Sequence, residues 1–142
     1  MARTIYAEIN LHITWHTKDG ASPTHGDVES RLHGYLRNRA VATDGVRFHA
    51  VGGMPDHVHL AVSVPPTLQI SEWIGELKGA SAHHVNHEVT NRKVLEWQTG
   101  YGVVSFGPKD LPWVVRYVEN QREHHSAGRI YSRLERAEAV AG

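Results

Sequence analysis

Alternating apolar and polar residues mark four stretches of the chain as half-buried strands, because successive side chains of a strand point to opposite faces. These stretches are 5–15, 46–51, 56–64 and 95–106. The second is expected to end at Gly52-Gly53, and a short connection then leads directly into the third. These two therefore predict an antiparallel hairpin. In the fourth stretch, Gly100 and Gly102 predict a bend or a bulge.

Apolar residues three and four positions apart predict three helices between and after these strands. The predicted helices cover about 24–42, 69–87 and 111–126. Asp110 can cap the last of them, and Gly128 is a natural stop after it.

The resulting order of elements, β-α-β-β-α-β-α, predicts an α+β fold of the ferredoxin-like (split β-α-β) type. Such a fold has an antiparallel sheet with two helices on one face, and here an additional C-terminal helix. The first and third strands would be central neighbours, and the last helix would cover the face opposite the first two. We expect a single domain over 1–128, followed by a short charged tail over 129–142 that could form an exposed helix.

Composition narrows the class of protein. The chain of 142 residues is 40% hydrophobic and 21% charged, which is ordinary for one globular domain. It lacks an apolar run long enough to span a membrane, a signal peptide and any cysteine, and this combination favours the cytoplasm. The formal net charge of zero argues against indiscriminate binding to duplex nucleic acid. Twelve histidines are more than this length predicts, so their placement matters.

Two of these histidines form a pattern with chemical meaning. His57 and His59 lie two positions apart in the third predicted strand and therefore project from the same face. The aliphatic residues between and after them project into the predicted core. Two imidazoles on a rigid strand are half of a metal site.

The last predicted helix offers the other half. Tyr117, Gln121 and His124 lie four and three positions apart, which places them on one stripe beside the apolar one. Tyrosine supplies a hydroxyl nucleophile, and glutamine supplies a carbonyl oxygen that can ligate a metal.

These motifs together resemble a known family. Met54-Pro55-Asp56-His57-Val58-His59-Leu60, followed by Tyr117-Val118-Glu119-Asn120-Gln121-Arg122-Glu123-His124-His125, is similar to the IS200/IS605 family of single-tyrosine transposases, which are HUH (His-hydrophobic-His) endonucleases. Supporting segments lie at 11–18, 77–81 and 97–103. The resemblance covers about residues 4–126. His-Val-His alone is weak evidence, whereas its conjunction with Tyr-x-x-x-Gln is specific.

The resemblance implies a metal-dependent transposase that cleaves and rejoins single-stranded DNA at hairpin-marked element ends, in the cytoplasm and on nucleoid DNA. Tyr117 would be the catalytic nucleophile and would form a covalent 5′-phosphotyrosine. His57, His59 and Gln121 would hold a divalent metal, Mg²⁺ or Mn²⁺. The resemblance also implies a homodimer in which the tyrosine helix of one subunit completes the site of the other.

Further residues are candidates for supporting the metal ligands or contacting DNA. They are Asp56, His12, Lys78, Arg116 and His124. Taken alone, His12, His124 and His125 are equally compatible with a plain surface role, whereas Lys78 and Arg116 fit solvated surface charges better than phosphate contacts.

Two alternatives remain open. A histidine-based phosphohydrolase fits poorly, because the third histidine of a histidine triad is replaced by Ala61, and only His12-Ile13-Thr14 matches the His-x-Thr motif that two-histidine phosphoesterases carry twice. A non-catalytic or domesticated hairpin-binding protein derived from such a transposase would keep the fold and lose the reaction. The intact tyrosine, histidines and glutamine argue against it.

Overall fold

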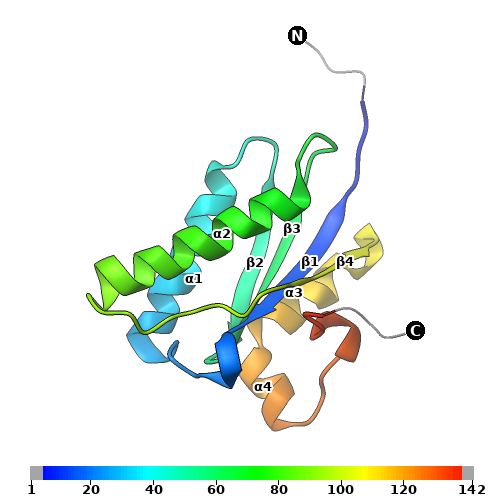
Figure 1. The fold of residues 1–142 in the computed structure, drawn as a ribbon. Helices are drawn as coiled ribbons and strands as arrows, with labels where there is room; N and C mark the ends of the chain where they lie inside the picture. The colour runs from blue at the N-terminus through cyan, green and yellow to red at the C-terminus, as the bar shows by residue number, and fades with distance from the viewer. Residues whose placement is uncertain (1–4, 139–142) are drawn as a thin grey trace.

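Four antiparallel strands form one sheet in the order β2-β3-β1-β4 (Figure 1). They are β1 (Asn10–His16), β2 (Arg47–Met54), β3 (His57–Ser63) and β4 (Gly102–Phe106). The computed structural model describes residues 5–138. Helices α1 (Gly26–Ala42) and α2 (Ile70–His84) follow β1 and β3, with a π-helical turn at Val85–Val89. The predicted ferredoxin-like α+β fold is confirmed.

The main core lies between the sheet and helices α1 and α2. Its buried side chains come from the odd-numbered positions of β1, the even-numbered positions of β3 and the inner stripes of both helices. They include Leu11, Ile13, Trp15, Val58, Leu60, Val62, Leu32, Leu36, Trp73, Ile74 and Leu77. Burying aliphatic side chains of this size contributes about 1.5–3 kcal/mol each, so this face anchors the fold.

The other face of the sheet is covered by the chain after β4, as predicted. A short 3₁₀ turn (Pro108–Asp110) leads into α3 (Leu111–Glu119), α4 (Gln121–Ser126) and a further 3₁₀ turn (Ser132–Leu134). Val114 and Val118 of α3 pack on Ala50 and Ala61 of the sheet, forming a second, smaller core.

Two strands are shorter than the alternation predicts. Residues 5–9 continue the apolar pattern but form no strand, because β1 pairs with β3 and β4 only from Asn10 onward. In Figure 1 this segment runs out of the sheet toward the N-terminus. Of the stretch 95–106, only the last five residues form a strand, since Gly100 turns the backbone at a φ of 102°. Trp97 makes an isolated bridge to Thr17.

Strand β2 is longer than predicted. The prediction that Gly52-Gly53 ends it was wrong, since pairing with β3 continues to Met54. The glycines are needed for packing instead. A Cβ atom on Gly52 would lie 1.9 Å from the backbone oxygen of Val118 in α3. The absence of a side chain therefore lets α3 approach the sheet.

Replacing Gly52 with alanine is expected to destabilise the protein. The added methyl group meets the backbone of α3, which cannot move aside as a flexible side chain would, so we expect a loss of about 1–3 kcal/mol in the free energy of unfolding. Urea denaturation measures it. Gly34→Ala is the matched control, because Gly34 is exposed on α1 with no atom within 4 Å of its added Cβ. This change should stabilise by up to about 1 kcal/mol. Equal effects of the two variants would contradict the packing argument.

The last predicted helix is broken, and the segment after it is docked. Asn120, with φ −113° and ψ 38°, separates α3 from α4 where the sequence pattern predicts one helix over 111–126. The expected exposed helix after Gly128 is a 3₁₀ turn whose Leu134 is buried. Residues 139–142 of that prediction lie outside the described residues. Over the range 5–138, every helix is too short or too polar to cross a membrane.

Candidate catalytic and metal-binding site

His57 and His59 of β3 lie on the sheet face that α3 covers. Both imidazoles are buried, with exposed fractions of 4% and 0%. The antiparallel register places Thr14 of β1 opposite His59, and His16 opposite His57. The ring of His16 stacks on that of His57 with centroids 4.9 Å apart. The strand alternation thus delivers both histidines to one enclosed place, as predicted.

Each of the two imidazoles is fixed through its Nδ1 atom. His57 Nδ1 lies 2.7 Å from Asp56 Oδ1, and His59 Nδ1 lies 2.8 Å from His12 Nε2. With the proton on Nδ1, each ring donates to its partner and directs the lone pair of Nε2 into the site. A carboxylate partner such as Asp56 is typical of a metal-ligating histidine. Asp56 and His12, both candidates from the sequence, therefore contact the histidine pair.

Burial sets the charge state of these imidazoles. It lowers the pKa of His12 to about 3, helped by the charge of His59. It also lowers the pKa of His59 to about 4, against the attraction of the Glu135 carboxylate. On His57 burial acts in the same direction, but Glu135 and Asp56 outweigh it and raise the pKa. His12 and His59 are neutral at pH 7, and the neutral imidazole is the form that binds a metal.

Tyr117 reaches the histidines from α3. Its ring stands perpendicular to that of His59 with centroids 5.9 Å apart, and its exposed fraction is 1%. The hydroxyl donates a hydrogen bond to the carboxylate of Glu135 and accepts one of 3.1 Å from the backbone N–H of Tyr131. Burial raises the pKa of Tyr117 well above its usual range, and the Glu135 carboxylate adds to the rise. The phenol is therefore protonated at pH 7 and needs positive charge nearby to become a nucleophile.

Gln121 opens α4 and is buried beside Tyr117. Its Nε2 donates a 2.8 Å hydrogen bond to the Tyr117 carbonyl, and its Oε1 accepts one of 3.0 Å from His125 Nε2. An amide oxygen has two lone pairs, so one is left for another partner. After the break at Asn120, α4 carries both Gln121 and His125, and the His125 ring lies 5.1 Å from that of His57. The predicted role of Gln121 as a metal ligand stays a prediction.

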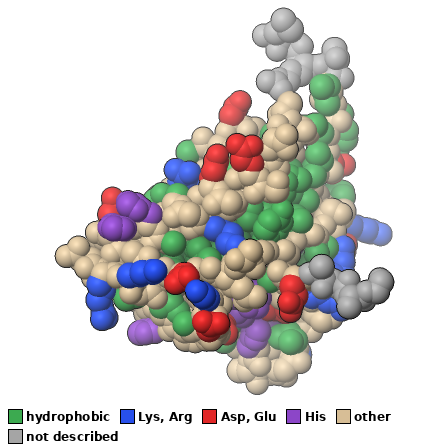
Figure 2. Space-filling model, viewed as in Figure 1, with side chains coloured by type: hydrophobic (Ala, Val, Ile, Leu, Met, Phe, Trp, Pro, Cys, Tyr) green, Lys and Arg blue, Asp and Glu red, His purple; other side chains and the backbone are tan. Residues whose placement is uncertain are grey.

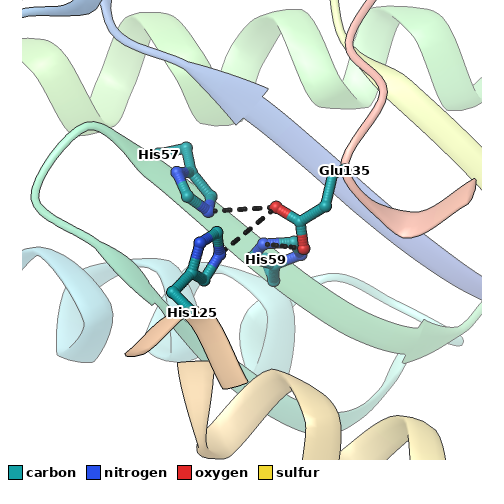
Figure 3. Close-up of side chains that lie close together, drawn as sticks. All are labelled: His57, His59, His125 and Glu135. Carbon is teal, nitrogen blue, oxygen red and sulfur yellow. Dashed lines mark ion pairs between the residues drawn. The ribbon is translucent and has the colours of Figure 1, made fainter. Parts of the chain in front are cut away.

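The structure adds Glu135, which the sequence pattern did not single out, and it brings His125 of the family motif into the same cluster. Figure 3 shows the Glu135 carboxylate pointing toward the rings of His57, His59 and His125. One ligand atom from each of the four lies within 4.8 Å of the others, so the cluster could hold a metal ion. His57 Nε2 and His59 Nε2 are buried without a hydrogen-bond partner in the described chain. Buried nitrogens left in this state fit a cation between them.

The remaining sequence candidates are divided between two places. Arg116 and His124 line a hollow on the outer side of Tyr117, with the His124 ring 4.9 Å from the tyrosine ring. Lys78 lies on α2, across the sheet, and its ammonium donates to the carbonyls of Gln98 and Gly100 at 2.7 and 2.8 Å. Lys78 is therefore not part of this site, and DNA contacts by these three residues stay predictions. Acidic and basic side chains are intermixed on the face that Figure 2 shows.

Comparison with known proteins identifies relatives of this chain. The family profile described as "Transposase IS200 like" matches residues 5–121. The ISDra2 transposase TnpA of Deinococcus radiodurans is 28% identical over 121 residues, covering 82% of this chain and 86% of the relative. The transposase for insertion sequence element IS200 of Salmonella typhimurium is 25% identical over 122 residues, covering 82% and 79%.

Solved structures show the same fold. A crystal structure assigned to a transposase of Deinococcus radiodurans R1 superposes with a TM-score of 0.68 at 27% identity, covering 85% of this chain and 96% of the other. A REP-associated tyrosine transposase bound to a REP hairpin superposes with a TM-score of 0.61 at 16% identity, covering 92% and 75%.

Proposed function

Because the chain belongs to the family of IS200-like transposases, we propose that it cleaves and rejoins single-stranded DNA at hairpin-marked ends through a covalent 5′-phosphotyrosine. Family membership implies cleavage and transfer of DNA strands. The observation that carries the finer proposal is the position of Tyr117, whose ring packs on His59 and whose hydroxyl reaches the carboxylate shared by both histidines.

The proposed reaction needs only one protein nucleophile. Tyr117 Oη attacks the scissile phosphorus, and the bond from phosphorus to the 3′ oxygen breaks. The phosphate stays on the 5′ end of the downstream strand, where it forms an ester with the tyrosine. The phenolic proton is lost and the 3′ oxygen takes one up as it leaves as a hydroxyl. Attack by the freed 3′ hydroxyl on the ester reverses the step and rejoins strands, because the ester conserves the phosphodiester bond energy.

His57 and His59, with Gln121 as a third ligand, would hold a divalent cation, Mg²⁺ or Mn²⁺. A cation held there supplies charge that stabilises the phosphate as negative charge develops on it. Asp56 and His12 orient the two imidazoles through their Nδ1 atoms. His125 keeps the Gln121 oxygen in place through its 3.0 Å hydrogen bond. Three protein ligands leave positions open for the substrate.

Hairpin recognition and dimer formation belong to this proposal as well. The hairpin bound by the REP-associated relative supports a folded single strand as the ligand, and such a substrate implies action on nucleoid DNA. We further propose a homodimer in which α3 of one subunit can complete the site of the other. The two ends of α3 support exchange, because a 3₁₀ turn at Pro108–Asp110 and the break at Asn120 interrupt the helix there. The described chain by itself already holds Tyr117 beside its own histidines.

A covalent adduct tests the reaction directly. Single-stranded hairpin DNA, incubated with the protein and Mn²⁺, should yield a protein–DNA adduct that survives denaturation and is seen by electrophoresis. Adding excess chelator beforehand should remove the adduct, since the paired histidines then lack the cation that offsets the high pKa of Tyr117.

Duplex DNA of the same sequence serves as the control substrate and should give no adduct. Binding of the hairpin without any adduct, across several candidate ends, would contradict the enzyme and favour a binding protein derived from a transposase. An adduct that forms equally well in chelator would retain Tyr117 as the proposed nucleophile but would remove the metal from the proposal.

A further inference from the structure

The C-terminal segment 129–138 is fastened over the site rather than extended from the domain. Leu134 is 2% exposed, and Arg133 donates a 2.8 Å hydrogen bond to the Ser105 carbonyl of β4. His16 of β1 lies 3.2 Å, through its Nε2, from the backbone oxygen of Glu135. Gly102 lets the segment pass closely, since a Cβ there would lie 1.7 Å from the Arg136 backbone oxygen. These contacts place the Glu135 side chain over the histidines.

The Glu135 carboxylate has the spacing of a ligand in a shared coordination sphere. Its Oε1 lies 3.3 Å from His57 Nε2, and its Oε2 lies 3.3 Å from His59 Nε2. Ligands about 2.1 Å from one ion, at angles between octahedral and tetrahedral, are roughly 3.0–3.4 Å apart. The two measured separations fall within that interval.

Well-formed hydrogen bonds do not account for this arrangement. Both Nε2 atoms lack a geometrically acceptable hydrogen bond despite their closeness to the carboxylate. When each Nδ1 atom carries the proton, lone pairs rather than N–H groups face Glu135. Lone pairs facing a carboxylate repel it unless a cation lies between them.

We propose that Glu135 is a ligand of the divalent cation before DNA binds, so that the cation fastens the C-terminal segment over Tyr117. This inference rests on the proposed function, because it takes the same cation and adds a ligand to it. The carboxylate also accepts the hydrogen bond of the tyrosine hydroxyl. The carboxylate is therefore an anionic acceptor that faces the tyrosine hydroxyl. In the proposed reaction the scissile phosphate has to replace it in this position before the hydroxyl can attack.

The test measures Mn²⁺ binding to the DNA-free protein by the electron paramagnetic resonance signal of free Mn²⁺. Glu135→Gln keeps the shape of the side chain and removes its charge, and we expect it to weaken Mn²⁺ binding at least tenfold. Glu138→Gln is the matched control, since Glu138 is exposed in the same segment and should bind as the wild type does. Glu135→Asp, which retains a carboxylate, should bind with intermediate affinity.

Limited trypsin digestion gives a second readout that does not depend on activity. Arg129, Arg133 and Arg136 are exposed in the segment. Mn²⁺ should slow cleavage there in the wild type and in Glu138→Gln, and should leave the rate unchanged in Glu135→Gln. Thermal melting of each variant checks that the domain is folded. If Glu135→Gln is unfolded, the comparison of Glu135→Asp with the wild type decides whether Glu135 is a ligand.

Three results would overturn the inference. They are a wild-type affinity for Mn²⁺ in Glu135→Gln, a rate of trypsin cleavage of the wild-type segment that does not change with Mn²⁺, and the lack of Mn²⁺ binding by the wild-type protein. Its failure is distinct from that of the proposed function. An adduct together with unchanged Mn²⁺ binding in Glu135→Gln rejects only the new ligand. Weakened binding in that variant without any adduct from the wild type rejects only the transposase reaction.

Discussion

Tyr117→Phe is expected to abolish the covalent protein–DNA adduct while leaving the fold intact. The variant loses a single oxygen atom, and with it the only atom of this side chain that can attack phosphorus. Losses on removal of a nucleophile are about 10⁴-fold or more, so no adduct should be visible after denaturing electrophoresis. The ring remains packed on His59, and only the hydrogen bonds of the hydroxyl to Glu135 and Tyr131 are lost. The bond from the Tyr131 N–H is worth about 1 kcal/mol and the bond to the charged carboxylate about 1.5–3 kcal/mol, so the variant should remain folded.

Tyr131→Phe is the matched control for this prediction. The Tyr131 ring lies 5.0 Å from that of Tyr117 and is half exposed, but its contact with the nucleophile uses its backbone N–H, which the substitution preserves. The control variant should form adduct as the wild type does. An adduct that survives in Tyr117→Phe would show that another side chain attacks the DNA and would remove Tyr117 from the proposed mechanism.

The position of Tyr117 beside the histidines could be foreseen because it depends on local periodicity. Two-residue alternation in β3 places His57 and His59 on one face, and the order of elements leaves that face for the last helix to cover. Val114 and Val118 then seat α3 there, as their spacing predicts. Each step needs only the sequence near the residue concerned, together with the fold.

Other features of the site depend on contacts between distant segments, and local patterns do not contain them. The break at Asn120 has no proline or glycine to mark it, although asparagine is a weak helix former. Glu135 is one acidic residue in a charged stretch, and only the docking of Leu134 brings its carboxylate to the histidines. Tyr131 and Leu134 are two apolar residues three positions apart. So short a pattern does not distinguish a turn that packs on the domain from one that is exposed. The prediction of a strand over residues 5–9 failed for the same kind of reason, because a strand needs a partner as well as a pattern.

Exchange of α3 between subunits is expected to cost this chain little free energy. The helix is held by apolar contacts of Val114 and Val118 with Ala50 and Ala61. The same contacts form whether the helix belongs to the same chain or to a second copy, which makes domain swapping a low-cost route to a dimer. The difference between the two assemblies then lies in the short connections at the ends of the helix. The free energy of folding therefore does not distinguish the exchanged dimer from the unexchanged chain, and an activity measurement is needed.

Mixing two inactive variants decides it. Tyr117→Phe lacks the proposed nucleophile and His59→Ala lacks a proposed metal ligand, so each alone should form no adduct. In an exchanged dimer of the two, the histidines of the first variant receive the intact tyrosine helix of the second. With free exchange of subunits, half of the dimers are mixed and half of their sites are intact, so we expect roughly a quarter of the wild-type adduct. Adduct should be measured by denaturing electrophoresis after co-incubation at saturating Mn²⁺.

The protein that carries the adduct identifies the route. An affinity tag on the His59→Ala chain alone should appear on every adduct, since only that chain contributes Tyr117. A control mixture of Tyr117→Phe with a variant carrying both substitutions should stay inactive, because it contains no tyrosine nucleophile at position 117. No recovery in the first mixture, with subunit exchange verified by co-purification, would mean that each chain uses the Tyr117 packed on its own His59. The dimer would then lose its catalytic role, and the proposed reaction would remain within one chain.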